Sequence, residues 1–174
     1  MTDQESVLAA YRLVAFLNSR GVGFERDSDQ LDAPETYGKF RAKLFPDIDS
    51  SEQESLPAVR KLRDALLALV TEDHSDAALA RLNELSTSNP FQYRFTADGA
   101  VVHEQQSGPT LIGMILQDVA QLFEQGNWNR LKICHNPACV SAFYDTTRAR
   151  TQRWHSYAIC GNKANVAAHR ARVV

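Results

Sequence analysis

The three cysteines of the chain and two of its five histidines lie in one stretch near the C-terminus, from residue 134 to residue 160. Cys134 and Cys139 are separated by four residues, and His155 and Cys160 are separated by four as well. Two short-loop pairs joined by a longer loop are typical of a tetrahedral zinc site, because each pair chelates the ion and the loop brings the pairs together. The spacing therefore predicts one Zn²⁺ bound by three thiolates and one imidazole.

This ligand set favours a structural ion over a catalytic one. Four protein ligands close the coordination sphere, whereas a catalytic zinc keeps one position for water. The surrounding segment also has too few apolar residues for a core of its own, so the metal would supply the missing stability. His135 is an alternative to His155 as the fourth ligand, and free buried cysteines without a metal are the simpler alternative.

Other chemistry of cysteine and histidine fits the sequence less well. A thiol redox pair usually has Cys-x-x-Cys spacing, which this chain lacks. A zinc deaminase needs His-x-Glu and Pro-Cys-x-x-Cys, whereas His103 and Glu104 are adjacent and no cysteine follows Cys139 in register. No nucleophile–base pair, metalloprotease motif or phosphate loop is evident, so we expect that the protein is not an enzyme.

The charges are divided between the two parts of the chain. Residues 130–174 carry a formal charge of +7, and residues 1–129 carry −9. An acidic body with a basic end often indicates that the basic end binds a polyanion. Attraction between the two parts of the chain is the simpler alternative.

The basic end is expected to finish in a helix whose cations lie on its surface. Alanines at helical spacing after Gly161 form a stripe that can pack on a neighbouring element. The cations flank this stripe, and others lie on the loop between the two ligand pairs. The predicted nucleic-acid surface consists of Arg148, Arg150, Arg153, Lys163, His169, Arg170 and Arg172.

Parts of this surface have a simpler interpretation. The terminal arginines can form a solvated tail, and Arg148 or Arg153 can pair with Asp145 to hold the finger. Trp154 is adjacent to a predicted ligand, so packing over the metal is favoured over stacking on a base. The sequence alone leaves these alternatives open.

The elements that position these residues are expected to be mainly helical. Apolar residues recur at helical spacing in four stretches, at 7–17, 59–69, 79–85 and 111–122. Capping-box patterns precede two of them, formed by Thr2 with Glu5 and by Ser51 with Glu54. Pro34 starts a further short helix.

One short β-hairpin is expected among the helices. Residues 91–96 alternate aromatic and polar side chains, and a second extended stretch follows the turn residues Asp98 and Gly99. The acidic part ends between Gly126 and Arg130, where the sign of the charge and the use of cysteine both change. The sequence therefore predicts a mainly α fold with a small β-hairpin, of the α+β class.

Length and composition indicate a folded protein outside the membrane. The 174 residues fit one domain, or one domain with a small module. No apolar run reaches 18 residues, and the acidic N-terminus lacks a signal-peptide core. We therefore expect a cytoplasmic protein, in which three cysteines do not form a disulfide framework.

The C-terminal motifs resemble the CGNR zinc finger, a bacterial module named for a Cys-Gly-Asn-Arg tetrad. The resemblance is carried by Cys134, Cys139, Phe143-Tyr144-Asp145, Arg148, Arg153-Trp154-His155 and Cys160-Gly161-Asn162-Lys163. The acidic part is similar to the ABATE domain in the stretches AFLNSRG at 15–21 and AVRKLRDALLALV at 58–70. The expected domains are an ABATE-like helical domain at 1–128 and a CGNR-type zinc finger at 129–174.

The chain departs from the family pattern at two positions. His155 stands where the family usually has cysteine, and Lys163 stands where it has arginine. Histidine preserves zinc ligation and makes the site less negative by one charge. Lysine keeps the positive charge but lacks the bidentate geometry of arginine.

Proteins with this architecture are described as transcriptional regulators, so the resemblance implies DNA binding. We therefore expect a zinc-dependent DNA-binding regulator whose C-terminal part is a treble-clef-like zinc finger ending in a helix. The main alternative is a protein-interaction or small-molecule-sensing module in which zinc only staples the C-terminal segment. RNA binding, a small-molecule effector at the N-terminal domain and a homodimer stay open.

Overall fold

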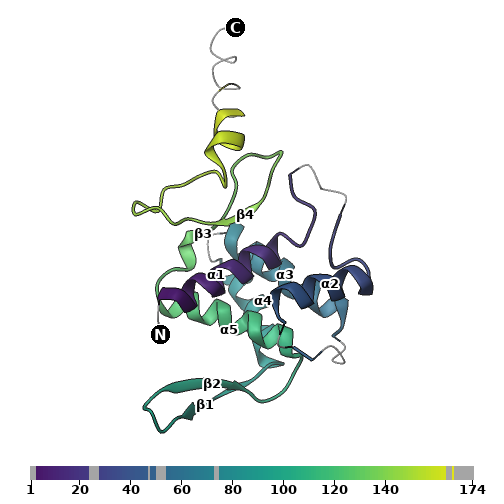
Figure 1. Ribbon diagram of the computed structural model, residues 1–174, viewed down its shortest axis with the longest axis vertical. Coiled ribbons are helices and arrows are strands. Elements are labelled where there is room, and N and C mark those ends of the chain that lie inside the picture. The colour runs from purple at the N-terminus through teal and green to yellow at the C-terminus, as the bar shows by residue number, and fades with distance from the viewer. Residues whose placement is uncertain are drawn as a thin grey trace.

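The computed structural model in Figure 1 describes the protein at residues 3–23, 28–46, 48–49, 54–72, 75–163 and 166. The helices are α1 (Asp3–Leu17), α2 (Pro34–Leu44), α3 (Leu56–Thr71), α4 (Asp76–Thr87) and α5 (Thr110–Glu124), with short helical turns η1 (Trp128–Arg130) and η2 (Tyr157–Gly161). The strands are β1 (Phe91–Phe95), β2 (Val101–Gln105), β3 (Leu131–Ile133) and β4 (Ala142–Tyr144). This mostly helical architecture confirms the predicted fold class. None of the helices in the described part of the chain combines the length and apolar composition that a bilayer crossing needs.

The core of the helical body lies among α1, α3 and α5. Val59 and Leu69 mark the ends of a stripe in α3 that is fully buried, as the sequence predicts. α5 buries Leu111, Ile115 and Leu122 in the same way. Burial of a large aliphatic side chain contributes about 1.5–3 kcal/mol to the free energy of folding. These two stripes therefore supply much of the free energy that holds the helices together.

The predicted buried face of α1 is wrong in part. The apolar periodicity places Val7 and Tyr11 on that face, but these residues are 65 % and 56 % exposed. α1 buries Ala10, Leu13 and Phe16 instead. Apolar residues surround most of this helix, so periodicity alone does not identify the side that packs against α5.

The predicted capping boxes involve residues that the structure does not describe. Thr2 and Ser51 lie outside the described residues. α3 begins after Ser55, which makes no side-chain capping hydrogen bond. The carboxylate of Glu54 instead accepts a hydrogen bond from the backbone N–H of Leu111 at 2.7 Å. This contact ties the start of α3 to the start of α5, a long-range role that local spacing does not indicate.

The predicted hairpin is confirmed as β1 and β2, which pair in antiparallel register with Phe95 opposite Val101. The loop between them comprises residues 96–100, so Asp98 and Gly99 do not form a two-residue turn. Gly99 has φ +83°, in the left-handed region that favours glycine. Figure 1 shows this hairpin and the turn η2 at opposite ends of the described part of the molecule.

A second hairpin, which the sequence did not predict, joins the helical body to the C-terminal segment. β3 and β4 pair in antiparallel register. One face of the pair carries Leu131 and Ala142, which belong to the core of the helical body. The other face carries Phe143, which packs with the cysteines. Three-residue strands are too short for a recognisable alternation, so only the tertiary structure reveals this element.

Arg63 is a charged residue of α3 that the fold buries. Its side chain is buried and forms a salt bridge with Asp29 at 2.6 Å. It also donates a hydrogen bond to the hydroxyl of Ser19 at 2.9 Å. A buried cation needs such partners, and here they fasten the chain between α1 and α2 onto α3.

Candidate metal centre

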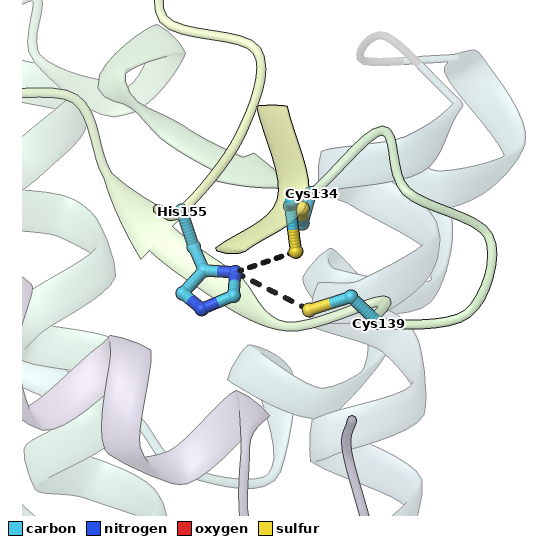
Figure 2. A group of neighbouring side chains, drawn as sticks. Cys134, Cys139 and His155 are labelled. Carbon is cyan, nitrogen blue, oxygen red and sulfur yellow. Dashed lines mark hydrogen bonds between the residues drawn. The ribbon is translucent and has the colours of Figure 1, made fainter. Parts of the chain in front are cut away.

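The four predicted metal ligands come together beside β4. The three Sγ atoms of Cys134, Cys139 and Cys160 and one ring nitrogen of His155 all lie within 4.8 Å of one another. The Nδ1 atom of His155 is 3.2 Å from Sγ of Cys139 and 3.7 Å from Sγ of Cys160. Figure 2 shows the side chains of Cys134, Cys139 and His155 pointing toward one another.

This donor set fits one structural zinc ion. In a tetrahedral site, Zn–S bonds of about 2.3 Å place the sulfur atoms about 3.8 Å apart. The cluster has this scale, since no two ligand atoms are more than 4.8 Å apart. Three thiolates and one imidazole would leave no position for water, which is the arrangement of a structural rather than a catalytic ion.

The surroundings of the thiols favour a bound cation. Burial raises the pKa of the Cys160 thiol to about 11. Burial also opposes ionisation of Cys139, but hydrogen bonds from Ser141 and the neighbouring thiols outweigh it and lower the pKa of this thiol. Adjacent thiolates repel one another, so a positive ion is needed for all three sulfurs to be ionised together.

Two backbone segments position the ligands. Cys134 and Cys139 lie on the loop between β3 and β4, where the backbone N–H of Cys139 donates to the carbonyl oxygen of Asn136 at 2.8 Å. Cys160 lies in the π-helical turn η2, in which the hydroxyl of Ser156 accepts a hydrogen bond from the N–H of Ile159 at 3.3 Å. The ion would therefore connect the β3–β4 loop to the start of the last helical segment.

Aromatic side chains cover the cluster. Phe143 is buried against the cysteines, and Trp154 packs on the same group. Trp154 also contacts Tyr157 edge to face, with ring centres 5.9 Å apart. The guanidinium of Arg153 lies 5.5 Å from the centre of the Trp154 ring. These contacts agree with the interpretation of Trp154 as a side chain that packs over the metal site.

Asp145 holds the loop between the two ligand pairs. Its carboxylate is fully buried and forms a salt bridge with Lys132 at 2.6 Å, so the alternative pairing with Arg148 or Arg153 is not observed. Two backbone N–H groups of the loop also donate to it, both at 2.9 Å. Burial alone would raise the pKa of Asp145, but the hydrogen bonds from Lys132 and Thr147 outweigh burial and hold this pKa well below its usual range.

Two arginines close the loop by binding backbone carbonyl groups. Arg130 donates to the carbonyl oxygens of Asp145 and Thr147 at 2.8 and 2.9 Å. Arg150 donates to the carbonyl oxygen of Gly126 at 3.0 Å. Sequence reasoning missed the structural role of Arg130, as it did that of Lys132, because composition reveals a positive charge but not the direction of the side chain.

The predicted nucleic-acid residues are only partly described. Arg148, Arg150, Arg153 and Lys163 are exposed, although Arg150 is also held by its bond to Gly126. The C-terminal alanine stripe lies beyond the continuously described chain. His169, Arg170 and Arg172 lie outside the described residues. Their contact with nucleic acid stays a prediction.

His135 is separate from the metal cluster. Its side chain is exposed, and its Nδ1 atom lies 3.4 Å from the guanidinium of Arg153. Its backbone N–H donates to the carbonyl oxygen of Arg153 at 3.0 Å. The structure therefore favours His155 over His135 as the fourth ligand.

The residues at the end of α1 hold the loop that carries Cys139. The Asn18 side chain donates to the carbonyl oxygen of Ala142 at 2.9 Å and accepts from its N–H at 2.7 Å. The side chain of Arg20 donates to the carbonyl oxygen of Val140, and the backbone N–H of Gly23 donates to that of Cys139, both at 2.9 Å. The end of α1 and the residues that follow it thus dock the finger onto the helical body.

Comparison with protein-family models agrees with these observations. Residues 12–126 match the ABATE model, described as "Putative stress-induced transcription regulator", which covers more than half of the chain. Residues 130–173 match the model described as "CGNR zinc finger". No curated protein matches the chain. The helical body and the metal cluster therefore correspond to two separately recognised modules.

Proposed function

The chain belongs to the ABATE family and ends in a CGNR zinc finger, and from this premise we propose that it is a DNA-binding transcription regulator. One structural zinc ion fixes the fold of the finger, and basic side chains on the finger bind the DNA backbone. The observation that carries the proposal is the Cys₃His cluster, because an ion bound there would join the two ends of the basic loop between the ligand pairs. The helical body then serves to receive a regulatory signal.

The proposed DNA surface begins with exposed cations on both sides of the cluster. Arg148 and Arg153 lie on the loop between the ligand pairs, and Lys163 follows Cys160 by less than one helical turn. An ion bound by the four ligands would fix the distance between these two groups of cations. His169, Arg170 and Arg172 would extend the surface along the C-terminal segment, and cations so placed contact phosphates without reading bases.

The decisive experiment selects genomic DNA fragments with the zinc-loaded full chain and measures their affinity by fluorescence anisotropy at several salt concentrations. The affinity is expected to fall steeply with salt, by a slope of about 0.9 for each phosphate contact. The double variants Arg148→Glu/Lys163→Glu and Arg170→Glu/Arg172→Glu are each expected to reduce both the affinity and this slope.

The matched control reverses two exposed cations of the helical body, in the variant Lys61→Glu/Arg81→Glu. It is expected to bind selected DNA as the wild type does, since both side chains lie outside the finger. Unchanged affinity of both finger variants, with one zinc ion per chain retained, would reject the assigned surface.

A second function is favoured by the contacts of Asn18. Because this side chain binds both backbone groups of Ala142, zinc can serve only to staple the finger onto a protein-interaction or ligand-sensing domain. This alternative predicts that chelation destabilises the chain and that DNA is not retained at any salt concentration. Retention of DNA on the wild type and its loss on the finger variants would exclude it.

A further inference from the structure

The hairpin β1–β2 carries an apolar face that the helical body leaves largely uncovered. Its register places Phe91, Tyr93 and Phe95 of β1 on the same face as Val101 and His103 of β2. Tyr93, Phe95 and Val101 are 69 %, 78 % and 53 % exposed. A two-stranded hairpin is marginally stable by itself, and an apolar face of this kind is a common mark of an interaction site.

This face continues onto the exposed side of α1. Leu8 of α1 and Val101 of β2 line the same cavity of about 450 Å³, in which Arg12 is paired with Asp118. The exposed large apolar side chains of α1 are Val7, Leu8 and Tyr11, and those of the hairpin are Tyr93, Phe95 and Val101.

The two edges of the hairpin differ. The outer edge of β2 faces α5, where the side chain of Gln117 donates to the carbonyl oxygen of His103 at 3.2 Å. Within the described residues, the outer edge of β1 has no strand beside it. An open edge is usually blocked by a charge, a bulge or a covering element. On its apolar face, β1 carries aromatic side chains in place of such a charge.

The backbone groups of β1 that point outward belong to the same aromatic residues. Pro90 and Thr96, which flank β1, form backbone hydrogen bonds across the hairpin at 2.9 and 3.0 Å. Hydrogen-bonded and non-hydrogen-bonded pairs alternate along an antiparallel ladder. The N–H and C=O groups of Phe91, Tyr93 and Phe95 therefore point away from β2, toward the open edge.

We propose that the outer edge of β1 pairs with the same edge of a second copy of this chain. The sequence Phe-x-Tyr-x-Phe reads identically in both directions, so an antiparallel pairing centred on Tyr93 places Tyr93 opposite its copy. Phe91 then lies opposite Phe95 of the other copy. The product is a four-stranded sheet with six aromatic side chains on one face, related by a two-fold axis. Only a second copy of the same strand matches this symmetric pattern residue for residue, so the pattern favours pairing of the chain with itself over pairing with a different protein.

The test uses analytical ultracentrifugation of the zinc-loaded full chain and charge changes at the two-fold axis. The wild type is expected to sediment as a dimer, at twice the chain mass of 19.4 kDa. Tyr93→Lys and Tyr93→Glu each place like charges opposite each other and are expected to weaken dimerisation at least about tenfold. An equimolar mixture of the two variants is expected to regain the dimer, because opposite charges then face each other.

Ala97→Lys and Ala97→Glu, on the exposed hairpin loop, are the matched controls and are expected to stay dimeric. Hydrogen exchange adds a direct readout, since the amides of Tyr93 and Phe95 are protected only when the edge is paired. A wild type that is still monomeric at a chain concentration of about 100 µM would overturn the proposal. So would Tyr93 variants that stay dimeric, or a wild-type dimer with unprotected amides at these two residues.

Discussion

The buried carboxylate of Asp145 organises the finger at the level of single residues. It neutralises Lys132 and accepts two backbone N–H groups of the loop that separates the ligand pairs. Without it, this loop would leave polar groups unpaired beside the metal site, which is costly in a buried environment. The four metal ligands therefore depend on a carboxylate that does not touch the ion.

Asp145→Asn is expected to lower the free energy of unfolding by about 2–4 kcal/mol, because an amide cannot replace a carboxylate beside Lys132. Urea unfolding of the zinc-loaded chain at pH 7 measures the effect. Asp98→Asn, in the exposed hairpin loop, is the control and is expected to leave the stability unchanged. Equal destabilisation by both variants would contradict the assigned role.

The same carboxylate predicts a pH dependence. The pKa of Asp145 in the folded chain lies below its unfolded value of about 3.9, so its ionisation stabilises the folded state above that pH. This contribution is lost as the pH falls from about 4 through the folded-state pKa. The stability difference between wild type and Asp145→Asn is thus expected to be largest near neutral pH and to shrink below about pH 4.

The metal ligands give a second prediction at the residue scale. Cys139→Ser and His155→Ala are expected to lose the stoichiometric zinc ion, which metal analysis after dialysis against a weak chelator measures. His155→Cys is expected to keep it, since thiolate and imidazole are both suitable ligands. His135→Ala is the control and is expected to retain one zinc ion per chain. Zinc retained in Cys139→Ser would show that the ligand assignment is wrong.

At the scale of elements, the end of α1 and the hairpin β3–β4 join the two parts of the molecule. One face of the hairpin is buried in the helical core, and the other packs with the cysteines. Asn18 adds two hydrogen bonds to the backbone of Ala142 beside the first ligand pair. The position of the metal centre is therefore coupled to the packing of α1.

Asn18→Ala is expected to destabilise this contact by about 1–3 kcal/mol, because it leaves the backbone groups of Ala142 without their partner. Hydrogen exchange of the Ala142 amide is expected to accelerate, while exchange within α5 stays slow. Asn162→Ala is the matched control, since that amide bonds only within its own turn in the described chain. Unchanged protection of Ala142 would show that the finger is held by the hairpin alone.

At the scale of the whole molecule, the residues that the structure describes form two hydrophobic clusters of unequal size. The larger one is formed by the helices together with one face of β3–β4. The smaller one contains only the three cysteines and Phe143, with Trp154 packed on it. So small a cluster cannot supply the free energy that orders the surrounding loops, which is why a bound ion is needed there.

Zinc removal from the full chain is therefore expected to unfold the finger and to leave the helical body folded. Far-ultraviolet circular dichroism is expected to keep most of its helical signal after chelation. Limited proteolysis is expected to cut the chain between residues 145 and 155, where the zinc-loaded protein resists. Cooperative loss of all helical signal on chelation would show instead that the two clusters fold as one unit.

The sequence by itself determined the three cysteine ligands, the helices α2 to α5 and the hairpin β1–β2, because each depends on local spacing of residue types. The choice of His155 over His135 as the fourth ligand needed the structure. Only the tertiary structure decided which side of α1 is buried, since an apolar helix can pack on several sides. It also decided that Lys132 pairs with Asp145 and that Asn18 holds Ala142. Such contacts join residues far apart in the chain, and their energy depends on burial and direction, which sequence spacing does not encode.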